Sequence, residues 1–363
     1  LELTIALTRI MLPFLTLVAI AAALMGMLNS LNRFFMPALS PAMFNVGIIL
    51  SALFLVPVMP GLGFDPIVAI AAGAVIGGLG QVALQVPSLY RQGYRYRPAL
   101  SPSDPGLREI MRLIGPGTLA GAAVQINLLV NMVLATGEGT GAVSWLGYAF
   151  RVMYLPIGLF GVSIATAALP TVSRHAAKDE LSGIRQTVSR ALRLMLMLQV
   201  PAMVGLIVLA VPTIELIFER GSFLPSDTAS TAAALLFYAP GLIGYSAVRI
   251  SVPCFYALRS SLTPALVSMA AVVLNIVLNL ILVRLIGYRG LALGTSVAAL
   301  ANAVVLLALL RRRLGGLDLD RVLIAFAKIA AAAVAMGWCA LVAHEWLSTL
   351  RPDDVGSMAR LAR

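Results

Sequence analysis

A permanent positive charge, Arg151, lies inside the long apolar stretch GYAFRVMYLPIGLFG. A charge at membrane depth costs on the order of 2.5 to 3.5 kcal/mol, so such a residue usually faces a protein interior or a water-filled cavity. The stretch begins near Val143, about eight residues or roughly 12 Å away along a helix, and snorkelling over part of that depth is the alternative interpretation. A guanidinium in a cavity can grip a phosphate or pyrophosphate through two parallel hydrogen bonds. The position therefore predicts an anionic substrate.

Two pairs of asparagines have a helical spacing of four residues. Asn127 and Asn131 occur in QINLLVN, Asn275 and Asn279 occur in VVLNIVLNLILV, and Thr295 lies on the apolar stretch that follows. This spacing places the two amides of a pair on one helix face. Their carbonyl oxygens could bind a cation, whereas hydrogen bonding between helices is the common alternative and contributes roughly 0.6 to 2 kcal/mol per bond. The spacing alone leaves both interpretations open.

Other residues that could carry chemistry are few. The chain has two histidines, His175 and His344, and two cysteines, Cys254 and Cys339, which lie in separate apolar stretches. The sequence contains no zinc-protease HExxH, no Walker loop and no Rossmann glycine pattern after a strand. We therefore expect a transporter without a cofactor, metal site or disulfide framework. A membrane enzyme that uses carboxylates near the interface is the remaining alternative in the enzyme class.

The composition is that of a membrane protein. Hydrophobic residues make up 60% of the 363 positions and charged residues 11%, which leaves too few polar residues to cover a water-soluble fold. The formal charge of +11 would suggest nucleic-acid binding in a soluble protein. Here the basic residues cluster between apolar stretches, as in cytoplasmic loops, so we expect no nucleic-acid partner. The composition predicts an all-α integral membrane protein.

Apolar runs between breakers predict about ten transmembrane helices. They lie near residues 6–30, 41–60, 66–90, 108–136, 143–169, 188–218, 227–255, 263–286, 289–311 and 321–347. Arginine-rich alternate connections mark the cytoplasmic side, which places both ends of the chain on the opposite side. The Pro-rich stretch 91–104 reads as a linker between lobes, and residues 178–193 read as a short amphipathic helix at the cytoplasmic interface.

Four long segments resemble the MurJ/MviN lipid II flippases, and the resemblance extends in order over nearly the whole chain. They are LTRIMLPFLTLVAIAAALMGMLNSLNRFFMPALSPAMFNVGII, WLGYAFRVMYLPIGLFGVSIATAALPTVSR, IFERGSFLPSDTASTAAALLFYAPGLIGYSAVRISVPCFYALRSSLTP and VVLNIVLNLILVRLIGYRGLALGTSVAALANAVVLLALLRRR. The resemblance implies the two-lobe fold of the multidrug, oligosaccharidyl-lipid and polysaccharide exporter superfamily. It also implies a multi-pass monomer in the bacterial cytoplasmic (inner) membrane, surrounded by membrane lipids.

The same comparison implies how the chain is divided. It begins at the family's fourth helix and ends after the thirteenth, so both ends are truncated relative to the family. Residues 1–90 form a partial N-lobe of three transmembrane helices, and residues 91–107 form a cytoplasmic interlobe linker. Residues 108–313 form a C-lobe of six transmembrane helices, and residues 314–363 form an additional C-terminal helix and tail.

The resemblance also implies roles for particular residues. The family's cavity arginine on its eighth helix matches Arg151, with a role in gripping the substrate's pyrophosphate. Pro156 and Gly158 in the same motif would let that helix bend during gating. Some members bind sodium, and their ligand positions match five residues of this chain. Leu291 would offer its backbone carbonyl, and the side-chain ligands would come from Asn131, Asn275, Asn279 and Thr295.

Two of these asparagines, Asn131 and Asn279, stand where the sodium-coupled members carry carboxylates. Without these two negative charges the site would attract a cation less strongly, so the sequence argues against sodium coupling. The membrane potential is the alternative driving force, worth about 2.3 kcal/mol per charge per 100 mV. The expected activity is alternating-access transport of lipid II, an undecaprenyl-pyrophosphate-linked disaccharide-pentapeptide, from the inner to the outer leaflet. Export of another polyprenyl-linked glycan or an amphipathic drug is one alternative, and a non-transporting scaffold or inactive fragment is the other.

Overall fold

The computed structural model describes residues 2–31, 33–95, 122 and 125–350. Within these ranges the regular structure is helical, with no strand. The chain divides into two compact units, Leu1–Asp104 and Pro105–Arg363. The division falls inside the predicted linker 91–107, of which residues 96–107 lie outside the described ranges. Each unit is described by itself below.

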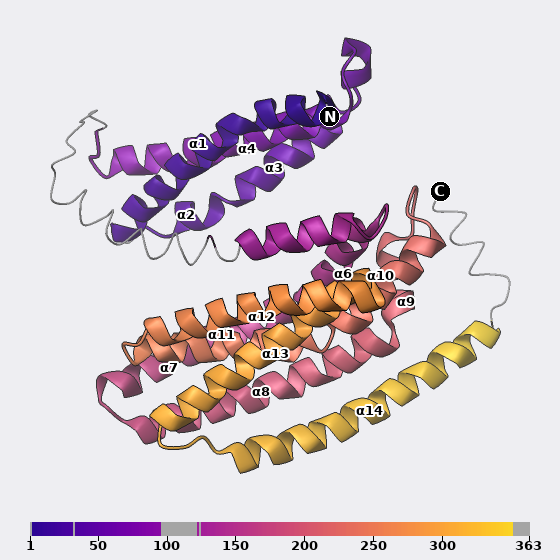
Figure 1. Ribbon diagram of the computed structural model, residues 1–363. Helices are drawn as coiled ribbons and strands as arrows, with labels where there is room; N and C mark the ends of the chain where they lie inside the picture. The colour runs from indigo at the N-terminus through magenta and orange to yellow at the C-terminus, as the bar shows by residue number, and fades with distance from the viewer. Residues whose placement is uncertain (1, 32, 96–121, 123–124, 351–363) are drawn as a thin grey trace. The chain divides into compact units, whose positions relative to one another are not determined.

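The first unit is a small bundle in which α1 and α3 both pack on α4 (Figure 1). Its elements are α1 (Glu2–Ser30), α2 (Phe35–Leu39), α3 (Ala42–Leu50), a π-helix (Ser51–Leu55), a 3-10 helix (Met59–Leu62) and α4 (Ile67–Arg91). Helices α3 and α4 approach closely, because a Cβ on Gly47 would lie 2.5 Å from the backbone nitrogen of Gly77. The amide of Gln85, fully buried on α4, donates to the Ala21 carbonyl (3.1 Å) and to Ser40 Oγ (2.9 Å). Small residues and one buried amide thus hold three apolar helices together.

The second unit is a larger helical bundle (Figure 1). Its elements are a helix Gln125–Thr136, α6 (Ala142–Pro156), a π-helix η3 (Ile157–Gly161), α7 (Val162–Ala177), α8 (Leu181–Val208), α9 (Ala210–Phe218), α10 (Pro225–Tyr238), α11 (Gly241–Ala257), α12 (Leu262–Ile286), α13 (Tyr288–Arg313) and α14 (Leu319–Leu350). Helix α13 packs on α12, α11 and α10, and α14 packs on α8. Helices from distant parts of the sequence therefore share one core.

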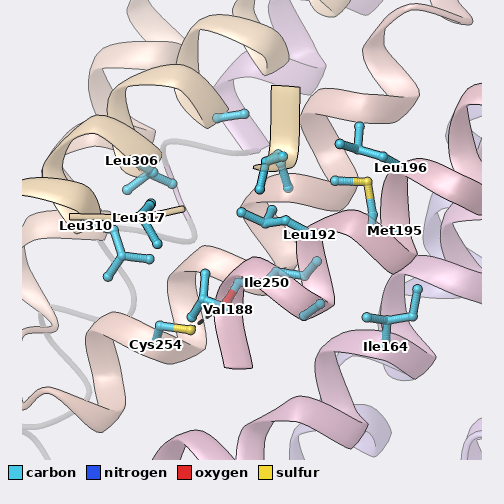
Figure 2. Packing of buried hydrophobic residues seen from close by; sticks show 14 of the residues in the cluster. Ile164, Val188, Leu192, Met195, Leu196, Ile250, Cys254, Leu306, Leu310 and Leu317 are labelled. Atoms are coloured by element: carbon cyan, nitrogen blue, oxygen red, sulfur yellow. Dashed lines mark hydrogen bonds between the residues drawn. The ribbon is translucent and has the colours of Figure 1, made fainter. Parts of the chain in front are cut away.

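The larger of the two cores in this unit joins α7, α8, α11, α13 and α14. Figure 2 shows its side chains interdigitating, among them Ile164, Val188, Leu192, Met195, Leu196, Ile250, Cys254, Leu306, Leu310 and Leu317. Cys254 is buried, and its Sγ donates to the Ile250 carbonyl one turn earlier (3.1 Å). It is a packing residue, as its apolar context predicts.

Among the described residues, seven helices are long and apolar enough to cross a membrane, or eight if the bent pair α10 and α11 forms one span. Two shorter apolar helices, Ala42–Leu55 and Gln125–Thr136, fall inside the predicted spans 41–60 and 108–136. Large apolar side chains cover the outside of the bundles, such as Leu12 (62% exposed) and Leu285 (71% exposed), as expected of surfaces that face lipid. The prediction of an all-helical integral membrane protein is confirmed, and the count of about ten spans is approximate.

Two local predictions need correction. Residues 178–193 do not form a separate interfacial helix, because the helix that starts at Leu181 continues without a break to Val208. The predicted span 227–255 is not one straight helix, because α10 and α11 meet at an angle of 47°. Pro240 occupies this junction, and a proline lacks the backbone N–H that would continue the hydrogen bonding of α10.

Candidate functional site

Helix α6 presents one face that combines aromatic, basic and small residues. Ser144, Tyr148, Arg151 and Leu155 follow one another at intervals of four and three residues, so they share this face, and Gly158 of η3 follows three residues later. They are exposed or half-buried within the second unit. The opposite face is buried in the smaller core of the unit and includes Leu146, Ala149, Val152 and Met153. The amphipathic sequence of α6 therefore orients Arg151 away from the core.

Arg151 lines a cavity of 510 Å³ together with Phe150, Tyr154, Leu155, Gly158 and Leu159. Its guanidinium carbon lies 5.6 Å from the centre of the Tyr148 ring, in a cation–π arrangement. In the part of the chain that the structure describes, the salt bridges are His175–Glu180 and Arg185–Asp318, so no carboxylate there neutralises Arg151. The guanidinium is thus a positive charge on an aromatic support, with donors free for an anion.

A second arginine, Arg249 of α11, contacts a residue of this cavity and was not predicted from the sequence. Its Nη2 donates a hydrogen bond to the hydroxyl of Tyr154, which lines the Arg151 cavity. Arg249 is exposed within the unit and, like Arg151, has no carboxylate partner among the described residues. The sequence does indicate Arg249, because a charged residue inside the predicted span 227–255 points to a protein interior or water-filled cavity, as it does for Arg151.

The predicted hinge residues lie where the helix loses its regular hydrogen bonding. Pro156 ends α6, and Gly158 lies in the π-helix η3 that joins α6 to α7. A fully buried glutamine on α8, Gln199, donates from Nε2 to the Pro156 carbonyl (3.1 Å) and to Ser246 Oγ (2.9 Å). Proline and π-helices are common causes of helix bending, and Gln199 supports the backbone at this point.

The five predicted cation-site residues come together from three helices. The Asn279 amide donates to the side-chain oxygens of Asn131 and Asn275, and Asn131 in turn donates to Asn275 (3.5 Å). Asn275 donates to Thr295 Oγ1 (3.4 Å), whose own hydroxyl donates to the Leu291 carbonyl (2.7 Å). Asn127, one turn before Asn131, makes no bond to this cluster, and its Oδ1 is buried without a partner among the described residues.

The arrangement of this amide cluster differs from that of a ready cation site. The oxygens of Asn131 and Asn275 are occupied by accepting hydrogen bonds from Asn279. The described residues also hold no group of three or more His, Cys, Asp or Glu side chains that could bind a metal. Cation binding would require amides to rotate and would gain no charge attraction from a carboxylate. The geometry is that of a network linking α12, α13 and the helix Gln125–Thr136.

The comparisons with known proteins decide the family. A family model described as lipid II flippase MurJ matches residues 1–354. The chain belongs to the MurJ lipid II flippase family. It is 36% identical over 305 residues to the probable lipid II flippase MurJ of Vibrio cholerae, covering 84% of this chain and 57% of that protein. It is 33% identical over 342 residues to the corresponding protein of Haemophilus influenzae, covering 91% and 65%.

Solved structures agree with this assignment. A lipid II flippase MurJ in an inward closed conformation aligns with a TM-score of 0.78 and 27% identity, over 92% of this chain and 67% of that one. A multidrug-resistance MATE family transporter of the MOP superfamily aligns with a TM-score of 0.72 at 18% identity, over 86% and 72%. The second likeness concerns the fold alone. The predicted membership of a transporter family is confirmed, and the chain spans 57% to 65% of the length of the two MurJ relatives.

Proposed function

We propose that this chain provides the substrate-binding part of a flippase that moves lipid II from the inner to the outer leaflet of the bacterial cytoplasmic membrane by alternating access. The observation that carries the proposal is the exposed guanidinium of Arg151, which lies beside an apolar cavity of a MurJ-family bundle and has no carboxylate partner among the described residues. Lipid II carries a pyrophosphate between its lipid and its disaccharide. The strongest pairing for such a group is a guanidinium that donates two hydrogen bonds to it.

Arg249 supports the proposal because it adds a second positive charge next to a residue of the cavity wall, Tyr154. Tyr154 accepts a hydrogen bond from Arg249 and lines the same cavity as Arg151, so the two arginines flank one cavity. A pyrophosphate diester carries two negative charges, and two guanidiniums on neighbouring helices match that charge. We assign primary contact to Arg151 and a supporting role to Arg249.

The membrane potential is the driving force we propose. In the amide cluster around Asn279 the oxygens of Asn131 and Asn275 already accept hydrogen bonds, only the Asn279 Oδ1 is buried without a partner among the described residues, and the cluster lacks carboxylates, which argues against strict sodium coupling. Each elementary charge that crosses the field gains about 2.3 kcal/mol per 100 mV. Collapsing the potential with an ionophore at constant sodium should stop transport, whereas removing sodium at constant potential should not.

Growth rescue tests the function itself. Bacteria depleted of their own lipid II flippase would express the longest reading frame that contains this chain, its Arg151→Ala and Arg151→Lys variants, and the 363-residue chain alone. Arg284→Ala, at the exposed end of α12, is a matched control for losing an arginine. Rescue by the long frame and by Arg284→Ala but not by Arg151→Ala supports the proposal. No rescue despite membrane expression favours another polyprenyl-linked glycan, a drug or a scaffold.

A further inference from the structure

A second cavity opens on the same face of α6, one turn before Arg151. It has a volume of 450 Å³ and lies between the start of α6 and the connection from α9 to α10. Its walls combine the aromatic rings of Tyr148, Phe218 and Phe223 with the polar side chains of Ser144, Ser222 and Arg220. Ligand cavities commonly have this size and this mixture of apolar surface with a few polar groups.

The aromatic rings form a single cluster. The Tyr148 ring centre lies 4.7 Å from that of Phe218 and 5.6 Å from that of Phe223, the latter in an edge-to-face arrangement. All three rings are half-buried, so each keeps part of its surface toward the cavity. A fixed aromatic surface of this kind binds flat, weakly polar ring faces without losing much conformational entropy.

Hydrogen bonds fix the walls of the cavity, and the exposed serine hydroxyls of the cavity take no part in them. Trp145 Nε1 donates to Asp227 Oδ1 (2.8 Å), and the backbone N–H of Leu224 donates to Asp227 Oδ2 (2.9 Å), which fixes the start of α10 against α6. Gly141, at φ +105°, allows the tight approach to Trp145. The hydroxyls of Ser144 and Ser222 have no hydrogen-bond partner among the described residues and remain available to a ligand.

Tyr148 connects this cavity with the Arg151 cavity. One part of its ring lines the aromatic wall, and the Arg151 guanidinium lies 5.6 Å from the ring centre. The two residues are separated by three positions, or roughly 4.5 Å along the helix axis. In lipid II the first sugar is bonded directly to the pyrophosphate. An anion held by Arg151 would therefore place that sugar within reach of the aromatic cavity.

We propose that this aromatic cavity binds a pyranose ring of the substrate's disaccharide. The inference rests on the proposed function and assigns the carbohydrate part of the same headgroup. The C–H groups on one face of a pyranose pack against the rings of Tyr148, Phe218 and Phe223. Ring substituents exchange hydrogen bonds with Ser144, Ser222 and Arg220. By the charge of the connections, this cavity lies toward the non-cytoplasmic side, so the sugar would lead the pyrophosphate outward.

Binding measured with two lipids tests the assignment. Purified protein from the longest reading frame would be titrated with lipid II and with undecaprenyl pyrophosphate, which lacks the sugar. Phe223→Leu keeps an apolar side chain and removes the ring. Tyr256→Leu, an exposed aromatic of α11 outside both cavities, is the control.

We expect Phe223→Leu to weaken lipid II binding by about two- to tenfold, the contribution of one aromatic contact, and to leave undecaprenyl pyrophosphate unchanged. Tyr256→Leu should keep the wild-type preference for lipid II. If Phe223→Leu weakens the binding of both lipids equally, the aromatic cluster has a structural role and the assignment is overturned. The assignment is also overturned if the binding of neither lipid is weakened. If the wild type binds neither lipid, the proposed function fails first, and the sugar assignment fails with it.

Discussion

The amide cluster gives a prediction whose size follows from the structure. Asn279 is fully buried and donates hydrogen bonds to Asn131 on another helix and to Asn275 on its own. Replacing Asn279 with leucine, a side chain of similar shape, removes both. Hydrogen bonds between membrane helices average about 0.6 kcal/mol and reach about 1.7 kcal/mol. Asn279→Leu should therefore lower the free energy of unfolding by about 1 to 3 kcal/mol.

The interhelical bond can be isolated in a double-mutant cycle. Unfolding of the single variants Asn279→Leu and Asn131→Leu and of the double variant would be measured in mixed micelles, where helices separate without leaving an apolar solvent. The expected coupling energy between the two positions is about 0.6 to 1.7 kcal/mol. A coupling near zero would refute the claim that this bond joins α12 to the helix Gln125–Thr136.

The same assay distinguishes a structural network from a sodium site. A ligand that binds only the folded state stabilises it in proportion to the logarithm of its concentration. We expect the wild type to unfold identically in sodium and potassium chloride. Asn279→Asp would introduce a buried carboxylate beside the oxygens of Asn131 and Asn275, and sodium should stabilise that variant selectively. Selective stabilisation of the wild type by sodium would contradict the structural interpretation.

Three further predictions concern local geometry. Gly141→Ala should destabilise the fold by about 1 to 3 kcal/mol in thermal unfolding, because Gly141 has a φ of +105° and a Cβ there would lie 2.7 Å from the Trp145 ring. Gly147→Ala should not destabilise the fold, because a Cβ on Gly147 meets open space. A Cβ on Gly158 would also meet open space, so Gly158→Ala should keep the wild-type thermal stability. We expect it to slow transport, because the added side chain restricts the backbone of the hinge. A hydrogen bond from His175 holds the pKa of Glu180 below its ordinary value, so its stabilisation is present at neutral pH and lost on acidification. Glu180→Gln should be less stable than wild type near neutrality, and the difference should shrink as the pH falls through the lowered pKa of Glu180.

Much of the fold could be predicted from the sequence because each transmembrane helix is a local property. Apolar length identifies a span whatever its neighbours are, and most of the predicted spans overlap with helices in the described part of the chain. The prolines pointed to bending in these helices, but neither the π-helix that follows Pro156 nor the 47° angle at Pro240 could be predicted from them. A proline in a membrane helix permits several outcomes, and tertiary partners such as Gln199 select among them.

The candidate site was only partly predictable. The spacing of Asn275 and Asn279 fixes a shared helix face, but which amide donates depends on Asn131, 144 positions before Asn275. Arg249 was missed although its sequence signal equals that of Arg151. The aromatic cavity could not be predicted, since it forms where α6 meets the connection from α9 to α10. Contacts between distant segments decide these features.

The central claim is that Arg151 binds the pyrophosphate of lipid II during transport. The most direct measurement is lipid II translocation in sealed vesicles containing the longest reading frame, as wild type, Arg151→Lys and Arg151→Ala. We predict that Arg151→Ala loses translocation by about tenfold or more, because a charge-assisted hydrogen-bonded pair is lost. Arg151→Lys should retain only part of the activity, since lysine supplies the charge without the two parallel bonds. Wild-type rates in both variants would contradict the claim.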